Sequence, residues 1–256
     1  MLISASNKTY YKNMENSPNK SHSKATLVMM PMPLGSLSKE AMNTHEFSTC
    51  ITSIKYWVVE NARTFRRFVS SLQLGINIDA LDIFELHRDF DRNALTVFLN
   101  GKIHKGDIGV ASEAGVPGMA DPGAEIAAWA HRNEVTVTAV CGPSSLLLAL
   151  SASGLNGQQF TFHGYAPVKE DELRSFLGKM GKDCEKTGYT QALIEAPYRS
   201  DRLLSSLLSV ISPDLKICVA CNLHEPDGFT KTRTVNEWKE NKPVLGKNPC
   251  IFLVGK

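Results

Sequence analysis

Short apolar segments rich in β-branched residues alternate with segments of helical spacing along the first half of this 256-residue chain. Strands are predicted at 26–30, 54–59, 81–86, 106–111 and 135–140. Helices are predicted between them at 38–49, 64–72, 94–100 and 125–132, the third of these ending at Gly101. Strands that alternate with helices predict a mostly parallel sheet covered by helices.

The pattern changes near residue 142. Gly142 to Ser145 open an apolar helix through Leu150, with Pro143 at its first position. Further strands are predicted at 160–163, 189–194, 216–221 and 250–254, with a helix at 200–210 and a hairpin around 226–228. We therefore predict an α/β fold of two domains, at 25–141 and 142–256, with mostly parallel or mixed sheets.

Composition narrows the class of protein. With 43% hydrophobic and 21% charged residues the chain is globular, although residues 1–24, rich in Ser, Asn and Lys, predict a flexible tail. The net charge of +2 neither requires nor excludes RNA. No apolar run approaches the ~20 residues of a membrane span, and no secretory signal is present, so we expect a cytoplasmic protein.

The sequence lacks the motifs that are typical of several kinds of enzyme. Cys218 and Cys221 have the spacing of a metal-binding pair, but no second pair exists and both fall in an apolar strand. We interpret them as buried thiols and predict no metal site. The chain also has no phosphate loop, no glycine-rich dinucleotide motif after its first strand and no nucleophile elbow. Nucleotide hydrolysis, hydride transfer and serine hydrolysis are therefore disfavoured.

Four unusual loops follow predicted strands, at 31–36, 112–123, 141–145 and 195–199. Ligands bind at the carboxyl ends of strands in parallel α/β sheets, so these loops are the candidate binding segments. The second loop contains three glycines, two prolines and the carboxylates of Glu113 and Asp121 within twelve residues. Such a loop lets backbone approach a ligand closely.

The same loops carry a family resemblance. The motifs, in chain order, are Pro31 to Gly35, Glu60 to Thr64, Ser112 to Gly123, Gly142 to Ser145 with Ala149 to Leu155, and Phe162 to Pro167. From about residue 26 to the C-terminus the chain resembles tetrapyrrole methylase-like proteins that use S-adenosylmethionine. It is most similar to the branch that methylates the 2′-hydroxyl of a cytidine in small-subunit ribosomal RNA. The resemblance implies a homodimeric methyltransferase with its cofactor in a cleft between two α/β domains.

Carried over by position, the resemblance implies a set of cofactor-binding residues. They are Pro33, Gly35, Ser112, Glu113, Gly115, Met119, Asp121, Ser144, Ser145, Ile194, Asn222 and Leu223. The segment from Pro249 to Cys250 is expected to touch the adenine.

Acidic residues at the strand ends are the candidate catalytic groups. Glu113 and Glu195 are placed to act on the substrate, because a ribose hydroxyl is a weak nucleophile that benefits from a proton acceptor. Each has a structural alternative: Glu113 as an acceptor of backbone N–H groups, and Glu195 as an ion-pair partner of Arg199. Asp121 could equally cap the helix that follows it.

The predicted substrate-binding residues are Glu60, Arg63, Arg66, Arg67 and Arg199. Glu60 with Arg63 repeats the arrangement of Glu195 with Arg199, so each pair could form a structural ion pair or meet substrate at the cleft. The three clustered arginines are either phosphate contacts or a solvated helix face.

Two other functions remain open. One is methylation of a tetrapyrrole or another small molecule. The other is a non-catalytic paralogue that binds the cofactor or RNA, which is suggested by departures from the family pattern at 61–64 and at Glu113.

Overall fold

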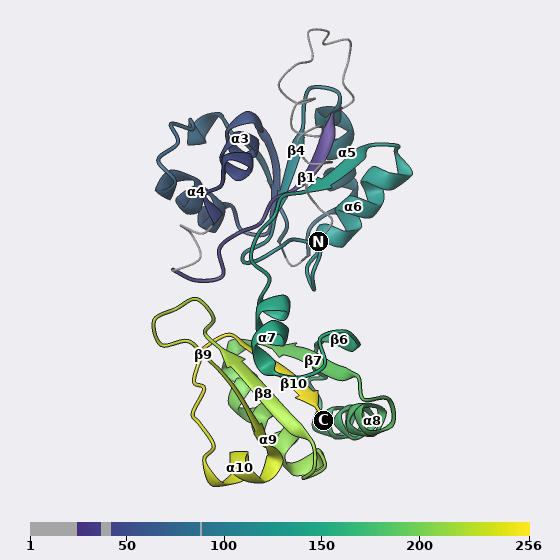
Figure 1. Cartoon of the computed structure of the whole chain (residues 1–256). Helices are drawn as coiled ribbons and strands as arrows, with labels where there is room; N and C mark the ends of the chain where they lie inside the picture. The colour runs from purple at the N-terminus through teal and green to yellow at the C-terminus, as the bar shows by residue number, and fades with distance from the viewer. Residues whose placement is uncertain (1–24, 37–41, 88) are drawn as a thin grey trace, which may run out of the picture.

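The computed structural model describes residues 25–36, 42–87 and 89–256, which form two five-stranded sheets (Figure 1). The predicted tail at 1–24 and the first part of the helix predicted at 38–49 lie outside the described residues. Among those described, no helix combines the length and apolar character needed to cross a bilayer.

The first sheet is entirely parallel, as the alternating pattern predicts, with the strand order β3-β2-β4-β1-β5. Its strands are β1 (Thr26–Met29), β2 (Tyr56–Val59), β3 (Asp82–Glu85), β4 (Ile108–Ala111) and β5 (Thr136–Ala139). The helices between them are α3 (His45–Ser53), α4 (Ala62–Ser71), α5 (Arg92–Ile103) and α6 (Gly123–Arg132), with a 3₁₀ turn, η1, at Ile78–Ala80.

Helices cover both faces of this sheet. Phe47 of α3 and Phe65 of α4 pack with Val28 and Trp57 on one face. On the other face, residues of α5 and α6 pack against Leu27, Val58 and Ile108. Figure 1 shows the two helix pairs on opposite sides of the strands. Because both faces are covered, the carboxyl ends of the strands remain the edge at which a ligand can reach the sheet.

Several helix ends differ from the prediction, most clearly those of α3 and α5. The helix expected at 94–100 continues to Ile103, so Gly101 lies inside it and does not end it. Three of its buried residues, Leu95, Leu99 and Ile103, continue the same helical stripe, and their burial outweighs the low helix propensity of one glycine. The helix predicted at 38–49 overlaps α3 at His45–Ser53, which continues beyond the predicted end; the Thr44 hydroxyl accepts a hydrogen bond from the Phe47 N–H at its start.

The second sheet is mixed, with the order β6-β7-β10-β8-β9. Its strands are β6 (Phe160–Tyr165), β7 (Thr190–Glu195), β8 (Lys216–Cys221), β9 (Phe229–Thr234) and β10 (Cys250–Gly255). The β6–β7 pair is parallel and the other pairs are antiparallel. The hairpin predicted around 226–228 is confirmed as the β8–β9 connection.

Helices again lie on both faces of this sheet. They are α7 (Ser145–Ser153), α8 (Glu170–Thr187), α9 (Ser200–Val210) and α10 (Val235–Glu240), with a 3₁₀ turn, η2, at Pro197–Arg199. Residues of α8, α9 and α10 pack on one face, and residues of α7 pack on the other. Pro143 precedes the cap residue Ser144 and so lies outside α7. The prediction omitted α8, whose buried Leu173, Leu177, Met180 and Cys184 are separated by charged residues and glycines.

The last strand of the first sheet ends at Ala139 and the first strand of the second begins at Phe160. We propose a domain boundary near residue 142, between these two strands. Cys218 and Cys221 lie buried in β8, as their apolar neighbours predicted, and all six cysteines are free thiols. Within the described residues, no group of three or more His, Cys, Asp or Glu side chains could hold a metal ion.

Candidate functional site

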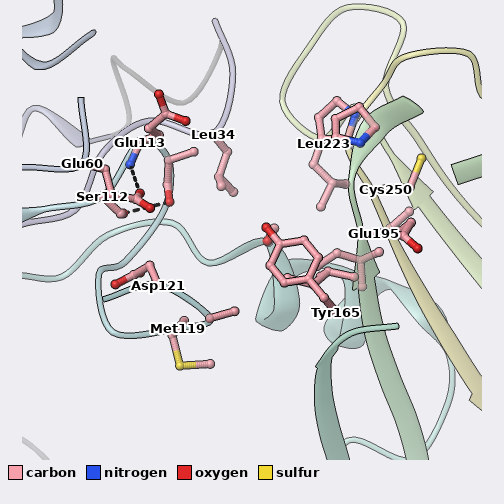
Figure 2. Close-up of a pocket in the computed structure, with 18 residues that line it drawn as sticks. Leu34, Glu60, Ser112, Glu113, Met119, Asp121, Tyr165, Glu195, Leu223 and Cys250 are labelled. Atoms are coloured by element: carbon pink, nitrogen blue, oxygen red, sulfur yellow. Dashed lines mark hydrogen bonds between the residues drawn. The ribbon is translucent and has the colours of Figure 1, made fainter. Parts of the chain in front are cut away.

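A cleft of about 380 Å³ lies where strand ends and loops of the two sheets face each other (Figure 2). The first half of the chain contributes Leu34, Glu60, Ser112, Glu113, Ala114, Met119, Ala120 and Asp121. The second half contributes Ser145, Tyr165, Ile194, Glu195, Pro197, Ala220, Leu223, Pro249, Cys250 and Ile251.

The loop at 112–123 begins where β4 ends and forms much of the first wall. The buried Ser112 hydroxyl donates a hydrogen bond to the Ala114 carbonyl at 3.0 Å. Gly115 exchanges two backbone hydrogen bonds with Met32, at 2.8 and 2.9 Å, and has a left-handed backbone with φ of 71°. These bonds tie the long loop to the loop that follows β1, so the two predicted binding segments form one surface.

Asp121 stabilises the long loop through hydrogen bonds to backbone groups of the same loop. Its carboxylate accepts hydrogen bonds from the Gly118 N–H at 2.8 and 2.9 Å and from the Gly123 N–H at 2.7 Å. Gly123 is the first residue of α6, so the bond to the start of this helix, proposed from sequence, is present. The side chain also faces the cleft (Figure 2).

Glu60 follows β2 and accepts a hydrogen bond from the Glu113 N–H at 2.7 Å. Burial raises the pKa of Glu60 above the ordinary glutamate range; the hydrogen bond from Glu113 opposes this shift, and the Asp121 and Glu113 carboxylates add to it. The predicted Glu60–Arg63 ion pair is absent from the described residues. Asn61 caps α4 through the Thr64 N–H, and Arg63 lies on the exposed surface of that helix.

The Glu113 carboxylate is exposed at the cleft and has no hydrogen bond or ion pair with any described residue. The alternative that it accepts backbone N–H groups therefore does not describe this structure. A free carboxylate beside the cleft can bind a cation or accept a proton.

On the opposite wall, Glu195 ends β7 and is almost fully buried. It forms an ion pair with Arg199, and its Oε1 also accepts the Ala196 N–H at 2.7 Å. The Arg199 side chain is 16% exposed and does not line the cleft. The structural alternative for this pair is therefore present, and contact of Arg199 with substrate stays a prediction.

Other predicted residues divide between the cleft and its surroundings. Met119, Ser145, Ile194 and Leu223 line it, and so do Pro249 and Cys250. Ser144 and Gly115 line a small adjoining cavity of about 50 Å³.

Pro33, Gly35 and Asn222 are not among the lining residues, although Leu34 between the first two is. The Asn222 side chain instead donates to Asp227 at 2.5 Å, within the β8–β9 connection. The basic cluster of Arg63, Arg66 and Arg67 is exposed on α4 and also lies outside the lining.

Several residues that line the cleft were not predicted from the sequence. Among those that are not buried, Tyr165 and Leu34 have the largest side chains. Both lie inside motifs that carried the family resemblance. Their position at the end of β6 and in the loop after β1 was the available signal, because strand-end loops were already the candidate binding segments.

Fold and cleft together define an α/β protein whose two sheets meet at one ligand-sized site. No family model matches the chain. The chain is similar to proteins named ribosomal RNA small subunit methyltransferase I, which confirms the resemblance found in its motifs.

Three of these relatives show the extent of the similarity. The Vibrio cholerae protein is 25% identical over 197 residues, which are 77% of this chain and 64% of the relative. The Campylobacter fetus protein is 27% identical over 71% of this chain and 65% of the relative. The Streptococcus pyogenes serotype M6 protein is 24% identical over 90% and 76%, respectively. The chain thus spans slightly less than two thirds of the first two relatives.

Proposed function

We propose that this protein is an S-adenosylmethionine-dependent methyltransferase that methylates the 2′-hydroxyl of a cytidine in small-subunit ribosomal RNA. The observation that carries the proposal is the cleft itself. It is lined by the strand-end loops that resemble this family, in a chain similar over 77% of its length to a protein named ribosomal RNA small subunit methyltransferase I.

The chemistry of the cleft residues fits the cofactor. A volume of about 380 Å³ is within the usual range of small-molecule sites. Carboxylates of Glu60 and Asp121 favour a ligand that carries a sulfonium and an ammonium group. Leu34, Leu223 and Ile251 offer apolar surface to an adenine ring. The bound cofactor would supply an electrophilic methyl group.

The protein's own contribution is alignment of the acceptor oxygen and removal of its proton. We assign proton acceptance to Glu113, because its carboxylate is exposed at the cleft and has no hydrogen bond or ion pair with any residue that the structure describes. Glu195 also faces the cleft, but its Oε1 is occupied by Arg199 and the Ala196 N–H. We propose that Glu195 shapes the wall through these contacts.

RNA binding requires positive charge near the cleft. Arg63, Arg66 and Arg67 lie exposed on α4, which begins two residues after the cleft residue Glu60. We propose that they contact phosphates outside the cleft. A net charge of +2 supplies little long-range attraction, so we also propose a homodimer, which doubles the basic surface offered to a ribosomal subunit.

The cleft favours RNA over a tetrapyrrole acceptor. Glu60, Glu113 and Asp121 line it without a basic partner among the described residues, and they would repel an acceptor that carries its own carboxylates into the cleft. A nucleotide can enter with its uncharged base and ribose while its phosphate stays outside.

The test measures transfer of labelled methyl groups to small ribosomal subunits that lack the modification, and cofactor binding by calorimetry. Wild type should transfer methyl groups, Glu113→Gln should be at least 100-fold slower with retained cofactor binding, and Arg63→Ala should weaken subunit binding with a smaller salt dependence. Arg132→Ala, at the exposed end of α6, is the matched control and should behave as wild type.

Absence of transfer with intact cofactor binding would contradict the proposed activity. Transfer to a tetrapyrrole mixture would then favour the small-molecule methylase, and no transfer to either substrate would favour the non-catalytic paralogue.

A further inference from the structure

Tyr165 is the large aromatic side chain of the cleft. It ends β6, an edge strand of the second sheet, after an irregularity in the β6–β7 register between Phe162 and Tyr165. The side chain is 58% exposed, whereas Ser112, Glu195 and Cys250 on the same lining are buried. Figure 2 shows its ring reaching from the second sheet toward the wall that carries Glu60 and Ser112. Tyr165 therefore stands at the rim, where an acceptor enters from solvent.

The Tyr165 hydroxyl has no hydrogen-bond partner among the described residues. Burial raises the pKa of this phenol, and the carboxylates of Glu60, Glu195, Asp121 and Glu113 raise it further. The phenol is therefore neutral at physiological pH and retains its proton as a hydrogen-bond donor. A ring with an accessible face and a free donor is suited to a planar, uncharged ligand.

The surrounding charge limits which part of an RNA can meet this ring. Glu60, Glu113 and Asp121 face Tyr165 across the cleft, and Glu195 lies on its own wall. A phosphate brought among these carboxylates would be repelled, whereas a base carries no charge. Proteins that bind unpaired nucleotides use stacking of bases on aromatic side chains, since every base has a π-face.

We propose that Tyr165 is a substrate-binding residue on which the base of the acceptor nucleotide stacks, so that its ribose points toward the Glu60–Glu113 wall. This inference rests on the proposed function and adds to it the residue that positions the acceptor. It requires the target nucleotide to leave its own stack and enter the cleft base first.

The experiment compares wild type with Tyr165→Phe, Tyr165→Ala and the control Tyr198→Ala. Tyr198 is 74% exposed in η2 and does not line the cleft, so it controls for loss of an exposed tyrosine near the same wall. Four quantities are measured at one salt concentration: affinity for S-adenosylhomocysteine, affinity of the protein loaded with this compound for unmethylated small subunits, methyl transfer, and molecular mass in solution.

We expect Tyr165→Ala to bind subunits roughly 5- to 100-fold more weakly, which is the range for loss of one base–aromatic stack. Methyl transfer at low substrate concentration should fall by the same factor. Tyr165→Phe should lose roughly threefold or less, because the ring remains. Affinity for S-adenosylhomocysteine should stay within roughly twofold of wild type in all variants, and Tyr198→Ala should match wild type throughout.

Subunit binding by Tyr165→Ala equal to wild type would overturn the inference, as would an equal loss in Tyr198→Ala. A matching loss of affinity for S-adenosylhomocysteine would assign Tyr165 to the cofactor, and a lower molecular mass would assign it to a contact between copies. If wild type binds subunits but transfers no methyl group, the proposed activity fails, while weaker binding by Tyr165→Ala still supports the stack. If wild type does not bind subunits at all, both proposals fail.

Discussion

Ser36 and Glu225 join the two halves of the chain beside the cleft. The Ser36 N–H donates to Glu225 Oε1 at 3.0 Å, and its hydroxyl donates to Oε2 at 2.6 Å. One residue earlier, a Cβ on Gly35 would lie 2.8 Å from the His224 carbonyl oxygen, so glycine permits this close approach. The contact lies next to two cleft residues, Leu34 in the loop after β1 and Leu223 in the β8–β9 connection.

Glu225→Ala removes both hydrogen bonds to Ser36 and should loosen Leu34. We expect the affinity for S-adenosylhomocysteine to fall roughly 3- to 10-fold by calorimetry, in line with the loss of one or two exposed hydrogen bonds. Glu240→Ala, at the exposed end of α10, is the control and should leave the affinity unchanged. Equal affinities in wild type and Glu225→Ala would show that the contact does not support the site.

Gly115→Ala tests the path of the long loop, with Gly154→Ala as a control of equal backbone strain. The two glycines have φ of 71° and 70°, and either alanine should cost about 1 kcal/mol. Only at Gly115 would the new Cβ meet neighbours, Leu34 Cδ2 at 3.2 Å and the Pro143 carbonyl oxygen at 3.4 Å.

Both variants should therefore melt cooperatively and slightly earlier than wild type, but only Gly115→Ala should lose affinity for S-adenosylhomocysteine, by roughly tenfold. The larger Gly115→Val should abolish binding. Normal affinity in Gly115→Val would mean that this loop does not contact the cofactor.

Arg199→Ala should destabilise the fold, because Arg199 supplies the positive charge that pairs with the buried carboxylate of Glu195. The side chains of Glu195 and Arg199 are 3% and 16% exposed, whereas those of Glu170 and Arg202 in the control pair are 50% and 45% exposed. We expect Arg199→Ala to lower the free energy of unfolding by about 3 kcal/mol and Arg202→Ala by less than about 1 kcal/mol. Denaturant titration measures both, and equal losses would contradict the role assigned to the buried pair.

Glu60 should make stability fall as pH rises. Its pKa is raised in the folded protein, chiefly by burial, so its contribution to stability is complete below the unfolded value of about 4.3. That contribution is lost as the pH rises through the folded pKa. Glu60→Gln lacks this loss, so its melting temperature should rise relative to that of wild type as the pH rises above about 4.3.

Glu237→Gln provides a control of opposite sign. Hydrogen bonds from the Thr234 N–H and hydroxyl lower the pKa of Glu237, so its contribution is present at neutral pH and is lost as the pH falls through the folded pKa. The melting temperature of this variant should therefore fall relative to that of wild type as the pH rises. The same trend in both variants would contradict the opposite pKa shifts of the two glutamates.

The parallel sheet and the binding segments were predictable because they depend on local patterns. Alternation of strand and helix placed β1 to β5, and the glycines and prolines of 112–123 marked a loop that now lines the cleft. The α8 helix was missed although Leu173, Leu177 and the other buried residues recur at helical spacing with charged residues between them. Gly178 and Gly181 lower the helix propensity of this segment, and packing on the second sheet outweighs them. Of the two alternatives for Glu60 and Arg63, the ion pair is not observed, because Asn61 caps α4 between them and Arg63 faces solvent.

The sequence by itself determined the α/β alternation, the shaped loops and their position after strands, since periodicity and backbone preference act over a few residues. Only the tertiary structure decided which carboxylates form hydrogen bonds or ion pairs within the described part of the protein and which do not. Glu60 is bonded to a backbone group 53 residues away, and Ser36 to a carboxylate 189 residues away. Such partners are brought together by sheet order and by the meeting of the two sheets, so no local pattern encodes them. The same long-range packing leaves Glu113 and Tyr165 open to the cleft.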